Sequence, residues 1–182
     1  REAPIEFAET ASMSMELMGL EHAEEVYPRE TARRVRRKHL EGLLRIFPWI
    51  ASIDSFQLWV YEHPHADAAA RCRAWVDIRA RFAPGIDWSG LEDALAHSWT
   101  AQMHLFVHPL YYIEYGIAQV AALQVWRSYR HGPRDAVAAY RRGLALGGTR
   151  PLPELFAAAG VRFDLSPNML HELVAEVEAA MA

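Results

Sequence analysis

Two glutamates near the start of the chain could bind or orient a metal ion. Glu9 and Glu16 are seven residues apart in a segment rich in apolar side chains. At 100° per residue, a helix would point them nearly the same way, about 20° out of register and roughly 10 Å apart along the axis. Carboxylates seldom lie among apolar residues unless they are paired or bind metal. An amphipathic helix whose acidic stripe faces water would show the same spacing, so both interpretations stay open at this point.

A second candidate site is the segment from His104 to Tyr115, which holds two imidazoles and three phenols. On a helix, Tyr111 and Tyr112 could each share a face with Tyr115. Phenol and imidazole donors set in an apolar wall can stabilise an oxyanion or hold a peptide backbone. The alternative is a helix that buries the tyrosine rings and leaves their hydroxyls in water.

Other reactive residues suggest no site of their own. His104 and His108 have the i, i+4 spacing of a zinc pair, but Leu105 stands where a general-base glutamate would be, and Pro109 predicts that the helix starts after His108. His171-Glu172 is interpreted as a surface pair, because Ala175 stands where a second zinc-binding histidine would be. Arg33 to Lys38 is interpreted as a solvated helical face and His63-Pro64-His65 as a polar turn. The Cys72 thiol is interpreted as inert.

Composition indicates a soluble globular protein of one domain. The 182 residues are 52% hydrophobic and 23% charged, and the net charge of -4 argues against nucleic acid as a partner. The single cysteine excludes a disulfide scaffold and favours a reducing compartment, so we expect a cytoplasmic protein. No segment is long and apolar enough to predict a membrane span. Eighteen arginines against one lysine suggest a GC-rich, bacterial genome.

The elements that would position these residues are predicted to be helices throughout. Apolar side chains recur at helical spacing, and strands with strict alternation are absent. Pro48 is expected to bend or break the second segment, and Ser89 is expected to cap the fourth. The sequence therefore predicts an all-α, single helical unit of seven or eight helices. The first five and the seventh are expected over about residues 5–22, 28–61, 67–82, 90–97, 109–129 and 151–159. The sixth is expected to begin at Pro133 and to be closed by Gly147-Gly148, and the last to begin at Ser166-Pro167.

Three segments together resemble a known family. The segment Phe7 to Leu17, FAETASMSMEL, resembles the helix that follows the zinc-binding motif in oligoendopeptidase F and its thimet-oligopeptidase-like relatives. The segment Ile53 to Glu62, IDSFQLWVYE, is similar to the next well-marked segment of that family. His104 to Tyr115 is similar to its substrate-binding histidine–tyrosine segment, and the three follow one another in the family's order.

The resemblance implies a mostly helical zinc peptidase that cleaves short peptides inside a deep channel. It implies that Glu9 is the third zinc ligand and that Glu16 orients one of the ligand histidines. It also implies that His104 and the tyrosines contact the substrate and stabilise the tetrahedral intermediate. Tyr112 and Tyr115 are the first choices for that role, and Tyr111 is the next.

One departure from the family pattern is decisive: the sequence contains no H-E-x-x-H. Two zinc ligands and the general base are therefore expected upstream of Arg1, in an N-terminal part of the same polypeptide. Residues 1–182 would then be the C-terminal part of a larger zincin-type catalytic domain, inactive in isolation. The alternative is a non-enzymatic helical module whose tyrosine-lined groove binds a peptide or a partner helix.

Overall fold

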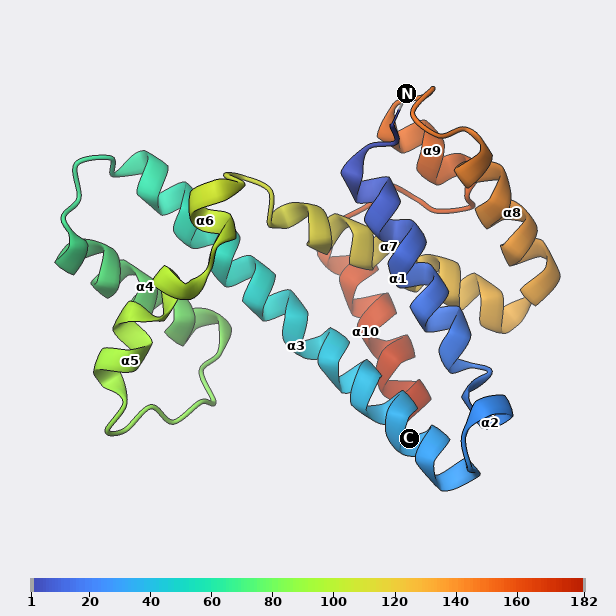
Figure 1. The fold of residues 1–182 in the computed structure, drawn as a ribbon, viewed down its shortest axis with the longest axis horizontal. Helices are drawn as coiled ribbons and strands as arrows, with labels where there is room; N and C mark the ends of the chain where they lie inside the picture. The colour runs from blue at the N-terminus through green and yellow to red at the C-terminus, as the bar shows by residue number, and fades with distance from the viewer. Residues whose placement is uncertain (1, 182) are drawn as a thin grey trace. The chain divides into compact units, whose positions relative to one another are not determined.

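The computed structural model describes residues 2–181, and this part of the chain contains helices and no strand (Figure 1). The predicted all-α class is confirmed. The ten α-helices and one short 3-10 helix are α1 (Ile5–Leu20), α2 (Ala23–Val26), α3 (Arg29–Glu62), α4 (Ala68–Phe82), α5 (Glu92–His97), η1 (Ser98–Ala101), α6 (His104–Val107), α7 (Ile113–His131), α8 (Pro133–Ala145), α9 (Leu152–Ala158) and α10 (Pro167–Met181).

Polar caps and glycines end several helices where the sequence predicts. The Asp67 carboxylate accepts a hydrogen bond from the Ala70 amide at the start of α4, 2.7 Å away. Gly160 closes α9 with a φ of 77°, in the left-handed region that favours glycine. The expectation that Ser89 caps the next helix is wrong: its hydroxyl donates to Asp87, and α5 begins at Glu92 without a side-chain cap.

Pro48 does not break the second predicted helix. It lies inside α3, which runs without interruption through 34 residues. The Ser52 hydroxyl donates to the Pro48 carbonyl, 2.7 Å away, and Ile50, Ile53 and Phe56 bury their side chains just beyond it. Burial of these large apolar side chains offsets the one backbone hydrogen bond that proline cannot form.

The helix expected after Pro109 begins later. A single turn, α6, contains His104, and the chain then turns through Leu110 before α7 starts at Ile113. Leu110 has a φ of 60°, and it is the one non-glycine residue in the left-handed region within the described chain. Such a conformation is costly for a branched side chain, so the surrounding structure must hold it.

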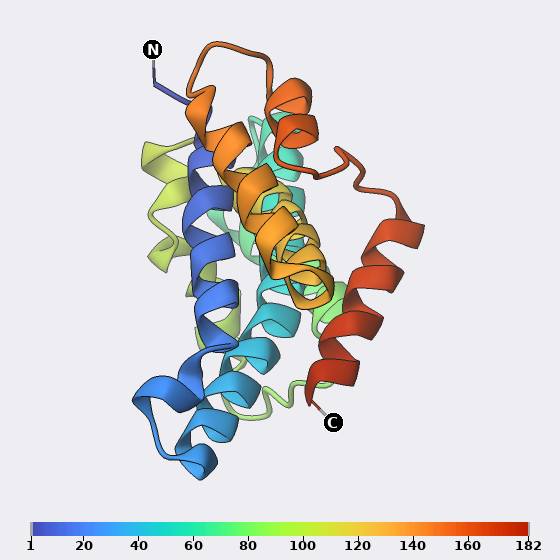
Figure 2. The same cartoon turned by 90° about the vertical axis from the view of Figure 1, so that its right-hand side faces the viewer.

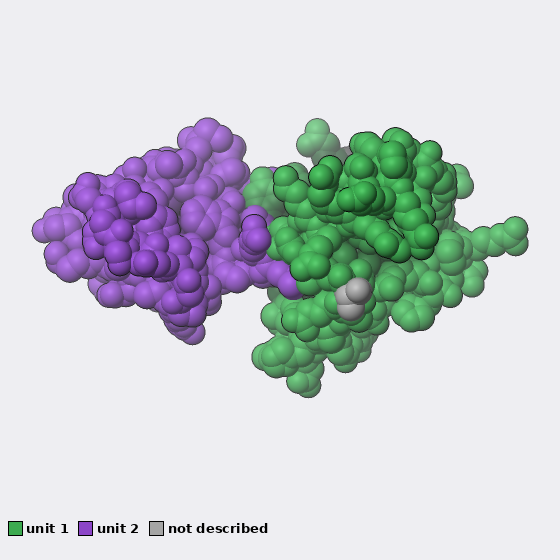
Figure 3. Space-filling view, turned by 90° about the horizontal axis from the view of Figure 1, so that it is seen from below, with its two compact units in different colours: residues 1–43, 114–182 green, residues 44–113 purple. Residues whose placement is uncertain are grey.

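The chain divides into two compact units, which the sequence pattern did not indicate (Figure 3). Unit 1 comprises residues 1–43 and 114–182, and unit 2 comprises residues 44–113. Helix α3 begins in the first and ends in the second. No helix among residues 2–181 combines the length and the apolar character needed to cross a bilayer.

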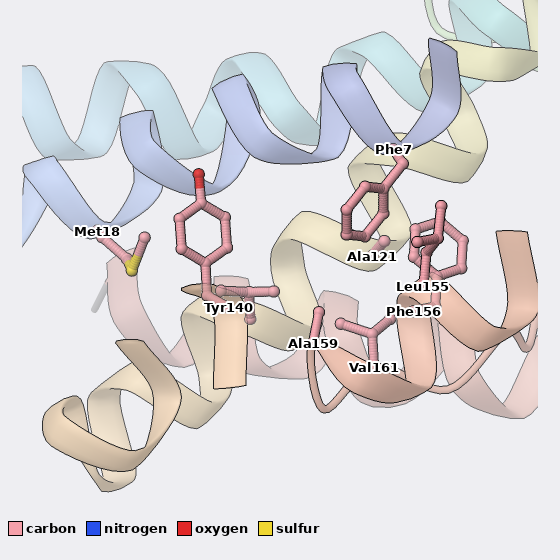
Figure 4. Close-up of a cluster of buried hydrophobic side chains, with 9 residues drawn as sticks. Phe7, Met18, Ala121, Tyr140, Leu155, Phe156, Ala159 and Val161 are labelled. Carbon is pink, nitrogen blue, oxygen red and sulfur yellow. The ribbon is translucent and has the colours of Figure 1, made fainter. Parts of the chain in front are cut away.

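The core of unit 1 lies where α1, α8 and α9 meet (Figures 2 and 4). Phe7 of α1 packs against Phe156 of α9, with ring centroids 5.8 Å apart. The buried Tyr140 of α8 donates its hydroxyl hydrogen bond to the Ala11 carbonyl of α1 over 2.9 Å. Gly143 lets α8 approach α9 closely, because a Cβ there would lie 2.8 Å from the Ala159 Cβ. These contacts fix α1, which carries both candidate metal-site glutamates.

The core of unit 2 is aromatic. Phe56 and Trp75 are buried and pack edge to face, with ring centroids 5.3 Å apart. The Trp75 indole donates to the Ser98 hydroxyl over 2.8 Å, so its buried N–H is satisfied. Trp49 and Tyr112 pack against this cluster from its edge. The segment that carries the candidate histidine and tyrosines is therefore anchored on a rigid base.

Candidate functional site

Helix α1 presents Glu9 and Glu16 on the face that points away from the unit 1 core. The core-facing stripe of the helix falls at i, i+3 and i+4 spacing. At 100° per residue, the two glutamates lie roughly 140° around the helix from the centre of that stripe. The sequence prediction that they share a face is therefore confirmed, and the buried stripe consists of Phe7, Thr10, Ser14, Leu17 and Met18.

Glu9 is half-buried although it faces away from the core. The Ser12 hydroxyl donates to the Glu9 carbonyl oxygen at 3.0 Å and reaches the carboxylate Oε2 at 3.5 Å. No cationic side chain within residues 2–181 pairs with this carboxylate. An uncommitted, partly buried carboxylate on a rigid helix can act as a single oxygen ligand to a metal ion.

Glu16 faces an imidazole of the same unit. Its Oε2 lies 4.0 Å from Nε2 of His39 on α3, and its side chain is 63% exposed. A carboxylate that contacts a ring nitrogen favours the tautomer with a proton on that nitrogen. The location of Glu16 therefore suits the orientation of an imidazole, and at this exposure the pair itself contributes little to stability.

A carboxyl pair joins α1 to the start of α7. The Glu114 carboxyl hydrogen-bonds to that of Glu6, and burial together with this neighbour raises the pKa of Glu114 from 4.5 to about 7. Its Oε2 is buried and accepts from no N–H or O–H donor within the described chain. A hydrogen bond between two carboxyls requires a proton on one of them. The pair lies one helical turn before Glu9 on α1 and beside the half-buried Tyr115 on α7.

In unit 2, His104 and Tyr112 lie edge to face, with ring centroids 5.1 Å apart. The Gln102 side-chain amide nitrogen lies 2.7 Å from His104 Nδ1. Because that amide nitrogen can only donate, Nδ1 accepts, and a neutral His104 carries its proton on Nε2. The Tyr112 hydroxyl oxygen accepts from the Trp49 indole N–H over 2.9 Å. Both side chains are thus held in place by hydrogen-bonding neighbours of the same unit.

Tyr111 completes this aromatic group. Its ring is nearly parallel to that of His104, at 6.0 Å between centroids, and lies 5.7 Å from the exposed His108. The left-handed Leu110 turns the chain between the two histidines and the two tyrosines. Strain in such a turn is often found where side chains must be held in a functional arrangement.

The sequence did not indicate the residues that hold this group. Arg79 stacks over the Trp49 ring at 4.9 Å, and the Arg79 guanidinium donates to Ser52 over 3.0 Å. The ring of Trp75 packs edge to face with that of Trp49, with ring centroids 5.8 Å apart. Trp49 lies 63 residues before Tyr112, and a contact over that separation leaves no signal in local spacing.

The predicted site residues divide between the two units. Glu9, Glu16 and Tyr115 belong to unit 1, and His104, Tyr111 and Tyr112 belong to unit 2. In the part of the chain that the structure describes, no three histidine, cysteine, aspartate or glutamate side chains are grouped to hold a metal ion. These residues therefore fit a zinc site as the source of one carboxylate, and they do not form one alone.

Comparisons with known proteins give matches that cover nearly the whole chain. The model of peptidase family M3 matches residues 1–175. No curated protein matches the chain. Among solved structures, it is similar to PZ peptidase A in complex with an inhibitor, with a TM-score of 0.90 and 29% identity. It is equally similar to a structure assigned to oligoendopeptidase F, with a TM-score of 0.90 and 30% identity.

A third structure, assigned to oligoendopeptidase F from Bacillus anthracis strain Ames, has a TM-score of 0.77 and 28% identity. All three matches cover 99% of this chain, but they cover 32%, 32% and 29% of the matched proteins. The chain thus spans about a third of the length of these relatives.

Proposed function

The chain belongs to peptidase family M3, and from this premise we propose that it is part of the catalytic domain of a zinc-dependent endopeptidase that hydrolyses short peptides. The observation that carries the proposal is the family match over residues 1–175. Two further observations support it: the half-buried Glu9 carboxylate has no cationic partner among residues 2–181, and His104 lies against Tyr112. A chain with one free cysteine is suited to the reducing cytoplasm, where we place the activity.

Glu9 supplies one of three protein ligands to zinc in this proposal. The other two ligands and the general base come from an H-E-x-x-H motif, which these 182 residues lack. Bound zinc would polarise the scissile carbonyl and make a water molecule acidic enough to act as the nucleophile. Glu16 orients a ligand imidazole, in the way that it faces His39 here.

His104, Tyr112 and Tyr115 bind the substrate carbonyl and stabilise the charge that develops on it. The Nε2–H of His104 and the O–H of Tyr112 are the donors in this proposal, and Gln102 and Trp49 hold these two side chains in place. The bond from Trp49 withdraws electron density from the Tyr112 oxygen, which makes its own hydrogen a better donor. Tyr111 contacts the peptide beside them.

The test is steady-state cleavage of an internally quenched peptide by the purified full-length polypeptide, with the expected H-E-x-x-H segment, before and after removal of metal by a chelator. We expect cleavage that is lost with the metal and restored by one equivalent of zinc. Cleavage that survives metal removal would contradict the zinc mechanism. Tight peptide binding without cleavage, at full zinc content, would favour the alternative, a non-enzymatic helical module for peptides or a partner helix.

A further inference from the structure

A cavity of about 620 Å³ in unit 1 is lined by four arginines and, within residues 2–181, by no acidic residue. The arginines lie on the second and third turns of α3, and two residues at the end of α10 complete the lining. The volume is within the range of about 300–1,000 Å³ that holds small molecules. The lining residues are Arg33, Arg34, Arg36, Arg37, Ala180 and Met181.

Few of these positive charges are compensated inside the protein. Arg37 pairs with Glu41 over 2.9 Å, and Arg36 lies 3.7 Å from Glu21. Arg33 and Arg34 make no hydrogen bond or ion pair with any residue from 2 to 181. The Arg36 Nη2 donates to the Leu20 carbonyl oxygen over 3.2 Å, but its Nε is buried and has no hydrogen-bond partner in the described part of the chain. A buried N–H without an acceptor is costly, and an anion in the cavity would supply one.

The arrangement along α3 adds to the charge imbalance. Arg33 is three residues before Arg36 and four before Arg37, so like charges share one face of the helix and repel. The chain as a whole has a net charge of -4, so this cavity is a local concentration of the opposite sign. An anion would relieve the repulsion between these guanidinium groups.

We propose that this cavity binds a small phosphate-bearing anion with a diphosphate group. Guanidinium groups bind phosphate oxygens in pairs, and four of them on adjoining turns match an anion with several oxygens better than a single carboxylate. Ala180 and Met181 give the lining one apolar wall, which would accept the uncharged part of a nucleotide. The arginines bind the diphosphate group, whether it is free or part of a nucleoside diphosphate.

The experiment is calorimetric titration of the purified protein, at low salt, with inorganic pyrophosphate and separately with ADP. The variant Arg33→Gln/Arg34→Gln removes two cavity charges from exposed positions. The matched control, Arg134→Gln/Arg141→Gln, removes two exposed arginines from α8. Melting temperature and peptide cleavage are measured in parallel, so that a defect in folding or in the proposed peptidase activity is recognised separately.

We expect pyrophosphate to bind the wild type and the control equally, and the cavity variant at least about tenfold more weakly, since each charge-assisted hydrogen bond is worth about that factor. Tighter binding of ADP than of pyrophosphate would assign the apolar wall to the nucleoside, and equal binding would assign the site to the diphosphate alone. No binding by the wild type, or equal losses in the two variants, would overturn the proposal.

Discussion

At the scale of single residues, the substitution Tyr112→Phe distinguishes a catalytic role of Tyr112 from a role in packing alone. We expect Tyr112→Phe to lower kcat by about 10²–10³-fold, because a donor aimed at a developing oxyanion acts mainly in the transition state. The substitution keeps the ring, and stability should fall by only about 1 kcal/mol, since the Trp49 N–H loses its acceptor. The measurements are steady-state peptide cleavage and thermal unfolding.

Tyr61→Phe is the matched control for this test, because Tyr61 is 57% exposed and lies in the same unit. It should leave both kcat and stability unchanged. We expect His104→Ala to resemble Tyr112→Phe in turnover while it leaves the zinc content intact. Wild-type turnover in both site variants would show that the aromatic group only packs.

Glu114 makes stability depend on pH. Its pKa is raised to about 7 in the folded protein from an ordinary 4.5, chiefly by burial and further by Glu6. Between these two values the folded state binds the proton more tightly than the unfolded state, so raising the pH favours unfolding. We expect the melting temperature to fall from about pH 4.5 to about pH 7 and to level off above that range.

In Glu114→Gln this pH dependence should largely disappear, because the amide can donate to the Glu6 carboxylate at any pH. The variant should melt above the wild type at pH 8. Glu176→Gln is the control, since Glu176 is similarly half-buried but faces Arg130 at 3.6 Å. It should keep the wild-type pH dependence. A melting temperature of Glu114→Gln that follows the wild-type pH curve would exclude the shared proton.

Spacing was sufficient to predict which residues could act, but not what holds them. The helical period predicts that Glu9 and Glu16 share a face of α1, and the structure confirms it. The partners Trp49, Gln102 and Glu6 could not be found in this way. Trp49 and Glu6 reach their partners through tertiary contacts. Gln102 is close to His104 in the sequence, but nothing in the local pattern indicates that it hydrogen-bonds to the imidazole.

At the scale of helices, Gly143 sets the distance between α8 and its neighbours. A Cβ at this position would lie 2.8 Å from the Ala159 Cβ and 3.0 Å from the Phe7 ring. We expect Gly143→Ala to lower the free energy of unfolding by about 1–3 kcal/mol through overpacking. The matched control is Gly42→Ala on α3, where nothing lies within 4 Å, and it should raise stability by about 0.5–1 kcal/mol.

Urea unfolding of the two glycine variants measures both changes. A neutral Gly143→Ala would mean that α8 can move away from α9 without loss, and that the core of unit 1 does not fix α1 as tightly as its contacts indicate. Because α1 carries Glu9, that result would also weaken the case for a rigidly held ligand.

The predicted helix boundaries agree with the structure where a single capping residue determines them. Asp67 begins a helix and Gly160 ends one, as predicted, because a capping oxygen and a left-handed glycine act within one turn. Two other residues do not behave as local chemistry alone would suggest: Pro48 does not break α3, and Leu110 is left-handed. Packing of the large side chains after Pro48 keeps α3 continuous, and the tertiary structure holds Leu110 in a conformation that its sequence disfavours.

At the scale of the whole molecule, the sequence predicted the helical class but not the division into two units. That division separates residues 43 and 44 within α3, where the helix continues through Gly42 and Pro48 and no polar linker marks a boundary. It also assigns the carboxylate group and the histidine–tyrosine group to different units.

The central claim is that this chain contributes Glu9 as a ligand to a catalytic zinc ion. The most direct test is the zinc content of the purified, metal-loaded full-length polypeptide, with the expected H-E-x-x-H segment, carrying Glu9→Gln, which keeps the side-chain shape and removes the charge. The matched variant Glu16→Ala should still bind zinc, about 10–100-fold more weakly. We predict that Glu9→Gln retains much less than one zinc per protein after dialysis and cleaves no peptide. One tightly bound zinc per Glu9→Gln protein would contradict the claim.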